Sequence, residues 1–222
     1  MSDSEPTALV VIGHHRSDSL TAAVAERAAK RLSAGGYRVD VLDLQAEGFD
    51  PRGNTADEPD YRNPDPRYSD EVHRHIARVH AADVIVPVFP VWWYGLPALL
   101  KGWIDRVWNS GIAYGRESKR MAGKRMLWIA LAGLPEDHPN SRFTREFLDG
   151  PLRVGISAYC DVPDAAAVAL YDAEAHGLSG ADRDRHYREL FAQAEAAVEA
   201  LIPTRAHLFS CFSEGVDVIR SF

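Results

Sequence analysis

The chain has 222 residues, 46% of them hydrophobic and 26% charged, which is the composition of a globular protein with one sizeable core. Its net charge of −7, from 25 Lys and Arg against 32 Asp and Glu, argues against nucleic acid or an anionic membrane as the partner. The polar N-terminus does not resemble a signal peptide, and no apolar run approaches the roughly 20 residues of a membrane span, so we expect a cytoplasmic protein.

The beginning of the chain predicts a strand, a helix and a second strand. Residues 8–12 are a continuous apolar run rich in β-branched side chains, which is typical of a strand buried on both faces of a parallel sheet. Apolar residues then recur at helical spacing over 20–32, where Asp18 or Ser19 can cap the helix and a Gly-Gly pair favours its end. Residues 37–44 predict the second strand.

A long irregular excursion separates this strand from the next helix. Residues 46–68 contain four prolines and two glycines among many Asp and Asn residues, and loops of this length in a compact domain are often functional. The chain then predicts a helix over 69–81, a third buried strand over 84–89 and, beyond an aromatic loop, a helix over 98–108.

The second half continues the alternation of strands and helices. It predicts a fourth strand over 124–132 and a short helix over 141–148. Either 154–160 or 165–170 should be the fifth strand, because both are short apolar stretches. An Ala-rich helix follows over 182–201.

Strands that alternate with helices predict a three-layer α/β fold with a doubly wound parallel sheet, of strand order 2-1-3-4-5. We interpret 1–222 as a single domain in which 203–222, apolar but without a clear period, is a C-terminal extension. Ligands bind such sheets at the carboxyl ends of strands one and three, where the winding direction reverses. This rule selects two loops, residues 13–21 and 90–95.

The loop over 13–21 opens a helix, so it offers unpaired backbone N–H groups and the positive end of the helix dipole. Its hydroxyl side chains include those of Ser19 and Thr21, and the run 14–16, His-His-Arg, adds possible cations. Asp18 would repel an anion, and we expect it to cap the helix and point away. The loop therefore suits a phosphate, although its composition also fits an ordinary capped helix with solvated basic residues.

The loop over 90–95 contains three consecutive aromatic residues, Trp92, Trp93 and Tyr94. Three adjacent rings cannot all face one core, so at least one of them should face a cavity. A flat, apolar isoalloxazine ring needs such a wall together with backbone N–H donors at its polar edges, and Gly95 would allow the backbone to approach closely. An aromatic patch at a protein interface is the competing interpretation.

These loops belong to a longer pattern. The run over 89–107, Phe-Pro-Val-Trp-Trp-Tyr-Gly-Leu-Pro-Ala-Leu-Leu-Lys-Gly-Trp-Ile-Asp-Arg-Val, resembles the signature of the NAD(P)H:quinone oxidoreductase family, a flavodoxin-like group of the DT-diaphorase and modulator of drug activity type. The pattern Gly-His-x-Arg-x-x-Ser-Leu-Thr over 13–21 and the pair Ala113-Tyr114 match it too. The resemblance extends over roughly residues 8–200.

The resemblance implies roles for particular residues. The positions that would hold the flavin phosphates and ribityl chain are His14, Ser19, Leu20 and Thr21. Those that would surround the isoalloxazine are Pro90, Val91, Trp92, Trp93 and Tyr94, with Leu131, Ala132, Gly133 and Leu134 along its other edge. Arg62 lies in a stretch that resembles the part of longer members that reaches the adenine half of FAD, which is the reason to expect FAD over FMN.

Two departures from the family pattern concern the acceptor site. Members commonly carry Thr-Thr-Gly-Gly after the fourth strand, where this chain has Leu-Ala-Gly-Leu over 131–134, so two hydroxyls are replaced by apolar groups. The family's downstream Tyr is missing, and His138 is the only group in that loop that titrates near neutral pH, so it is a candidate proton donor or substrate contact. By resemblance, Tyr114 would line the acceptor pocket across a dimer interface.

The activity implied is a ping-pong transfer of a hydride from NAD(P)H through the flavin to a quinone or similar small acceptor, by a homodimer. The helix residues 103–108 and the tail 203–222 are candidates for the dimer interface or, equally, for the core. The alternative is a flavin-binding regulatory subunit of a potassium-efflux type transporter. We expect no metal site, and Cys160 and Cys211, which lack metal-site or disulfide spacing, should be buried thiols.

Overall fold

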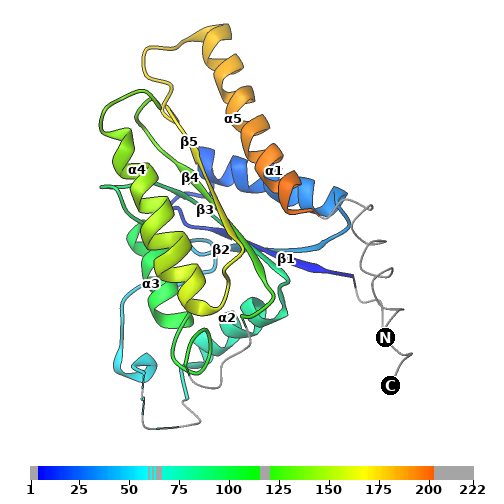
Figure 1. Cartoon of the computed structure of the whole chain (residues 1–222), viewed down its shortest axis with the longest axis vertical. Coiled ribbons are helices and arrows are strands. Elements are labelled where there is room, and N and C mark those ends of the chain that lie inside the picture. The colour runs from blue at the N-terminus through cyan, green and yellow to red at the C-terminus, as the bar shows by residue number, and fades with distance from the viewer. Residues whose placement is uncertain (1–4, 60, 62, 64–66, 116–120, 203–222) are drawn as a thin grey trace, which may run out of the picture.

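A single parallel sheet forms the centre of the molecule in the computed structural model, which describes residues 5–59, 61, 63, 67–115 and 121–202. Its strand order is β2-β1-β3-β4-β5 (Figure 1), so the predicted doubly wound order is confirmed. The strands are β1 (Thr7–Ile12), β2 (Arg38–Asp43), β3 (Val84–Pro90), β4 (Arg125–Leu131) and β5 (Ala165–Leu170).

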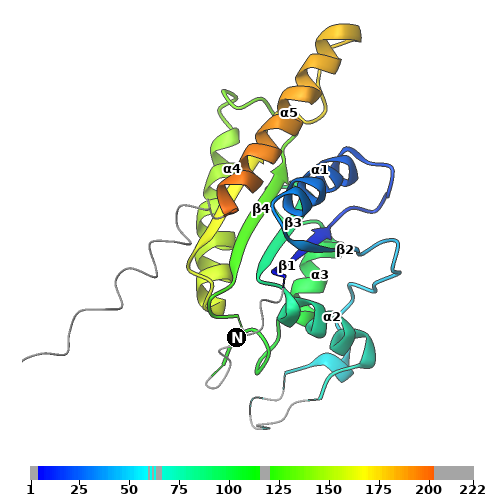
Figure 2. The ribbon, with the colours of Figure 1, turned by 90° about the vertical axis from the view of Figure 1, so that its right-hand side faces the viewer.

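Helices cover both faces of the sheet, as the views in Figures 1 and 2 show. The helices are α1 (Leu20–Ala34), α2 (Asp70–Ala81), α3 (Ala98–Val107), α4 (Ser141–Phe147) and α5 (Gly180–Leu201). Alternate residues of β1 enter two separate cores: Leu9 and Val11 pack with α2 and α3, whereas Ala8 and Val10 pack with α1 and α5. The strand is wholly buried because it has a core on each side.

The fifth strand is 165–170, which decides between the two stretches that the sequence left open. The chain over 154–160 is helical instead, because α4 continues into a π-helical segment, Leu148–Ser157, followed by a short 3₁₀ helix, Ala158–Cys160. Pro151 lies inside this segment and has no N–H to donate to a preceding carbonyl, which disfavours regular α-helical bonding. The predicted helix over 141–148 is therefore longer and less regular than expected.

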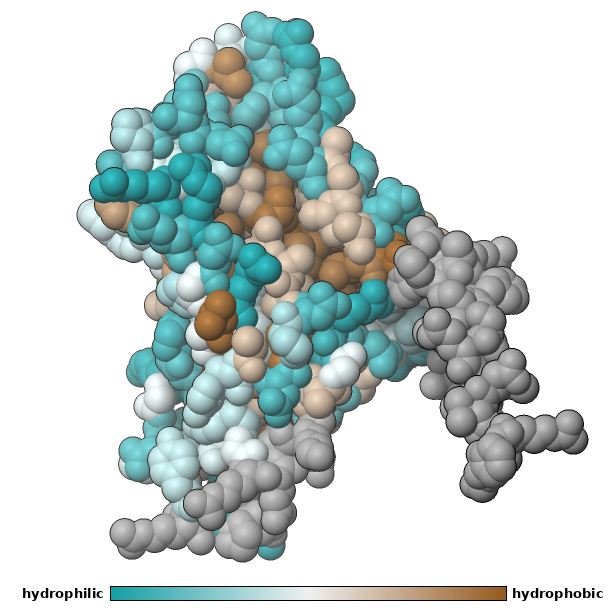
Figure 3. Space-filling view, in the orientation of Figure 1, coloured by the Kyte–Doolittle hydropathy of each residue, from teal (hydrophilic) through white to brown (hydrophobic). Residues whose placement is uncertain are grey.

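The strand β5 lies at the edge of the sheet and pairs only with β4 among the described strands. Its residues 166–169 are partly or fully exposed. Figure 3 shows apolar surface on this face of the molecule, between α4 and α5. Alanine side chains make up most of the strand, so its exposed side is apolar but shallow.

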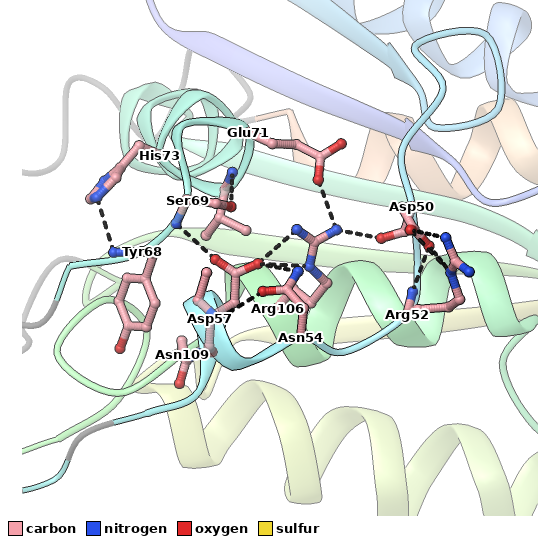
Figure 4. A network of polar contacts seen from close by, with 12 residues as sticks. Asp50, Arg52, Asn54, Asp57, Tyr68, Ser69, Glu71, His73, Arg106 and Asn109 are labelled. Atoms are coloured by element: carbon pink, nitrogen blue, oxygen red, sulfur yellow. Dashed lines mark hydrogen bonds and ion pairs between the residues drawn. The ribbon is translucent and has the colours of Figure 1, made fainter.

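The excursion over 46–68 is held against α3 by a buried ion pair (Figure 4). Nη2 of Arg106 lies 2.6 Å from Oδ2 of Asp57, and the two side chains are 4% and 1% exposed. Glu71 of α2 contacts the same guanidinium at 2.8 Å. Gly102 allows this close packing, because a Cβ there would lie 2.1 Å from the carbonyl oxygen of Pro51.

The remaining predictions concern membrane-spanning helices, the two cysteines and the C-terminal tail. No helix among the described residues is long and apolar enough to cross a membrane. Cys160 is buried, as predicted, and burial raises the pKa of its thiol to about 11. Cys211 and the whole tail over 203–222 lie outside the described residues, so the predicted extension and its interface role stay predictions.

Candidate active site

The two loops selected by the sequence meet at the carboxyl edge of the sheet. Strands β1 and β3 are neighbours, with Ile12 beside Val88, and the N–H of Gly13 donates to the carbonyl of Val88 at 2.9 Å. Beyond the strands, the imidazole rings of His14 and His15 lie 5.7 and 5.5 Å from the indole of Trp92. The first loop therefore touches the aromatic loop directly.

The start of α1 has the features of an anion site. Ser19 is the helix cap, and its Oγ accepts a hydrogen bond from the N–H of Ala22 at 3.2 Å. Thr21 is buried, and the first turn contains no acidic residue. Asp18 does not cap the helix, contrary to expectation: it lies 2.9 Å from Nε of Arg16 in an exposed ion pair, which partly neutralises its charge.

Contacts with the backbone of Arg16 hold the imidazole of His14 in the first loop. Nδ1 of His14 lies 3.0 Å from the backbone nitrogen and 3.2 Å from the carbonyl oxygen of Arg16, so it accepts from the first in one tautomer and donates to the second in the other. Burial lowers the pKa of His14, and the neighbouring His15 and Arg16 lower it further. A bound phosphate would act in the opposite direction, because an anion favours the protonated imidazole.

The aromatic loop is a tight turn that stores backbone strain. Trp92 and Gly95 exchange both backbone hydrogen bonds, at 3.2 and 3.0 Å. Trp93 and Tyr94 between them have φ angles of 52° and 56°, the left-handed pair of a type I′ turn that normally requires Asn or Gly. The side chain of Trp93 is 96% exposed. Strained residues and an exposed indole together indicate a binding function over a structural one.

The turn forms one wall of a cavity of about 230 Å³. The residues that line it are Val91, Trp93, Tyr94, Ala132, Leu134 and Thr144. The loop after β3 and the loop after β4 are joined here, since the N–H of Val91 donates to the carbonyl of Leu131 at 2.8 Å. An apolar, partly aromatic wall with backbone amides nearby fits one part of a flat heteroaromatic ring.

Five of the six lining residues are among those that the sequence predicts to contact the isoalloxazine ring. The sixth, Thr144, was missed, because it lies on α4 and no local pattern distinguishes it from other helix residues. Four further positions that the sequence predicts to contact the ring do not line the cavity: Pro90, Trp92, Leu131 and Gly133. Leu20, predicted to hold the phosphate end, is the first residue of α1. Arg62 lies outside the described residues, so its predicted contact with FAD stays a prediction.

The two predicted catalytic residues lie away from this cavity. Tyr114 packs against Tyr159, with ring centroids 5.5 Å apart, and burial together with a hydrogen bond to Tyr61 raises the pKa of its phenol. His138 stabilises the start of α4: its Nδ1 accepts from the N–H of Asn140 at 3.1 Å, and its carbonyl accepts from the N–H of Ser141. These contacts do not test the catalytic roles predicted for Tyr114 and His138.

Comparison with known proteins agrees with the fold. Residues 6–198 match the model of a family described as having a flavodoxin-like fold. An uncharacterized NAD(P)H oxidoreductase of Escherichia coli (strain K12) is 35% identical over 197 residues, which are 86% of this chain and 96% of that protein. NAD(P)H dehydrogenase [quinone] 1 of Rattus norvegicus is 32% identical, over 69% of this chain and 64% of its own length.

Among solved structures, general stress protein 14 of Treponema denticola, in complex with FMN, is similar with a TM-score of 0.59. It is 22% identical, and the match covers 86% of this chain and 99% of that chain. At this level of identity the likeness concerns the fold alone.

Proposed function

The chain belongs to the family with the flavodoxin-like fold, and from this premise we propose that it is a flavin-dependent NAD(P)H oxidoreductase that reduces quinones or similar small acceptors by two electrons. The observation that carries the proposal is the meeting of two unlike loops at one edge of the sheet. One is an anion site at the start of α1, and the other is an aromatic turn beside an apolar cavity. A flavin nucleotide matches both loops, because one of its ends is a phosphate and the other is a flat, apolar isoalloxazine ring.

Each loop would perform a separate task. The N–H groups of the first turn of α1, with the hydroxyl of Ser19 and the imidazole of His14, would bind the phosphate of the nucleotide. Val91, Tyr94 and Leu134 would hold the ring and exclude water from one of its faces. The flavin supplies the hydride chemistry when it is bound. Backbone amides around the turn would stabilise the negative charge that the ring gains on reduction.

The acceptor would bind over the exposed side of the ring, where Trp93 offers a free indole face. In the homodimer that we propose, Tyr114 of one protomer would complete the acceptor pocket of the other. Tyr61 and Tyr159 beside it are 74% and 67% exposed, so this tyrosine cluster has free surface for such a contact. We propose FAD as the flavin, with Arg62 on its adenine half, and cytoplasm as the location.

The test begins with the visible absorption spectrum of the purified protein, before and after reconstitution with FAD or FMN. We expect a yellow protein that bleaches with NAD(P)H under air-free conditions and regains its colour when a quinone is added. Chromatography of the released nucleotide then distinguishes FAD from FMN. A colourless protein that neither flavin reconstitutes would refute the proposal.

Turnover also separates the enzyme from the transporter subunit considered above. An enzyme oxidises NAD(P)H with a quinone in the absence of other proteins, at a rate proportional to its concentration. A protein that bleaches but is not reoxidised by any quinone would instead favour a regulatory flavoprotein. No feature of the described residues specifically favours that alternative.

A further inference from the structure

One buried polar side chain faces the ring cavity without a partner. Thr144 is 4% exposed and lines the cavity with the aromatic turn and the loop after β4. Its hydroxyl makes no hydrogen bond to another residue in the part of the chain that the structure describes. A helical threonine commonly bonds the carbonyl four residues earlier, but no such bond from Thr144 to Asn140 is present among the described residues.

The hydroxyl is not among the fully buried polar atoms without a partner, which among the described residues are Nε1 of Trp108 and the hydroxyl of Tyr171, so it opens toward the cavity that Thr144 lines, where a ligand can accept its hydrogen bond. The other lining residues offer no equivalent group. Val91, Ala132 and Leu134 are apolar, and the polar tips of the aromatic turn belong to Trp93 and Tyr94, which are 96% and 40% exposed. Thr144 is therefore the one buried side-chain donor among the described residues that line the cavity.

The helix that carries Thr144 is held firmly at its start. Oγ of Ser141 donates to the carbonyl of Pro135 at 2.6 Å, and the N–H of Ser141 donates to the carbonyl of His138 at 2.9 Å. These bonds tie α4 to the loop that carries Leu134. The backbone that carries Thr144 is thus held in place before any ligand binds, which lowers the entropy lost on binding.

We propose that the hydroxyl of Thr144 donates a hydrogen bond to a polar edge of the bound flavin ring and thereby raises the flavin's reduction potential. The inference rests on the proposed function and adds a cofactor contact from α4. A donor at the ring edge favours the form with more negative charge, which is the reduced flavin. The contact would supply one hydroxyl to a site whose loop over 131–134 has no side-chain donor.

The test compares Thr144→Val, which keeps the shape and removes the hydroxyl, with Thr144→Ser, which keeps the hydroxyl. Thr7→Val is the matched control, because Thr7 is also buried but lies at the start of β1, and its Oγ1 accepts from Arg38 at 3.0 Å. The readouts are the dissociation constant of the oxidised flavin, from fluorescence titration, and the two-electron potential, from equilibration with a reference dye.

Thr144→Val should weaken binding of the oxidised flavin about 5-fold and of the reduced flavin about 50-fold, because hydrogen bonds to charged groups are roughly twice as strong. The tenfold difference corresponds to a potential lower by about 30 mV. Thr144→Ser and Thr7→Val should stay within about 15 mV of the unaltered protein, since a threefold difference between the two dissociation constants converts to about half the tenfold shift.

Three results would overturn the inference. If Thr144→Val keeps both the affinity and the potential, the hydroxyl does not contact the ring. If Thr144→Ser and Thr144→Val shift the potential equally, the effect comes from the methyl group and packing. If the unaltered protein binds no flavin, the proposed function fails together with the inference, which distinguishes that failure from the first two.

Discussion

Replacing Arg106 by alanine should destabilise the protein strongly, because the change leaves the buried carboxylate of Asp57 without its cation. The guanidinium contacts Asp57 through Nε at 3.0 Å and Nη2 at 2.6 Å, and Glu71 through Nη1 at 2.8 Å. It also donates to the carbonyl of Asp50 and lies 4.9 Å from the ring centroid of Phe49. All of these partners except Glu71 belong to the excursion between β2 and α2.

The magnitude follows from the burial of the pair. Removing one partner of a buried ion pair typically costs about 3–5 kcal/mol, and the side chains of Arg106 and Asp57 are 4% and 1% exposed. In a chain of this size, 1 kcal/mol shifts the melting temperature by about 2–4 °C. The Arg106→Ala protein should therefore melt about 6–20 °C below the unaltered protein, measured by circular dichroism with denaturant unfolding as a second probe.

The matched control is Arg52→Ala. Arg52 lies in the excursion that Arg106 of α3 holds in place. Arg52 pairs with Asp50, but its side chain is 86% exposed, and exposed ion pairs contribute little to stability. This variant should melt close to the unaltered protein. If Arg106→Ala and Arg52→Ala melt together, the buried network does not hold the excursion to α3, and the reasoning is refuted.

Three further predictions use the same measurements or simple chemistry. Burial alone would raise the pKa of Asp57, but hydrogen bonds from Ser69 and Arg106 outweigh it, so the pKa is lowered from 3.8. The stabilisation by the Arg106–Asp57 pair should therefore be complete above about pH 4 and be lost as pH falls below that. Asp57→Asn should remove this part of the acid dependence of stability. Trp93→Asn should raise stability by about 1 kcal/mol, because Asn tolerates the left-handed conformation, yet weaken flavin binding; a fall in stability on denaturant unfolding would contradict the strain argument. In a Cys211→Ser background, Cys160 should resist thiol reagents at pH 8 until denaturant is added, since burial raises its pKa to about 11; rapid labelling of the folded protein would contradict its burial.

Local pattern was sufficient to predict the order of the strands and helices and the two loops of the site. Apolar runs such as 8–12 and 84–89 are bounded by turn residues and separated by helical periodicity, and a parallel sheet of alternating units has few allowed topologies. Once the sheet order was predicted, the edge at which strands one and three end followed. The rings at 92–94 then stood out because no core could take all three.

Only the tertiary structure decided features that depend on contacts between distant segments. The stretches 154–160 and 165–170 are both apolar, but only the second pairs with β4, whereas the first belongs to the helical segments that follow α4. Arg106 meets Asp57 from 49 positions away, and Thr144 enters the ring cavity from α4. Such partners have no signature in local composition, because packing of one element on another selects which side chains meet.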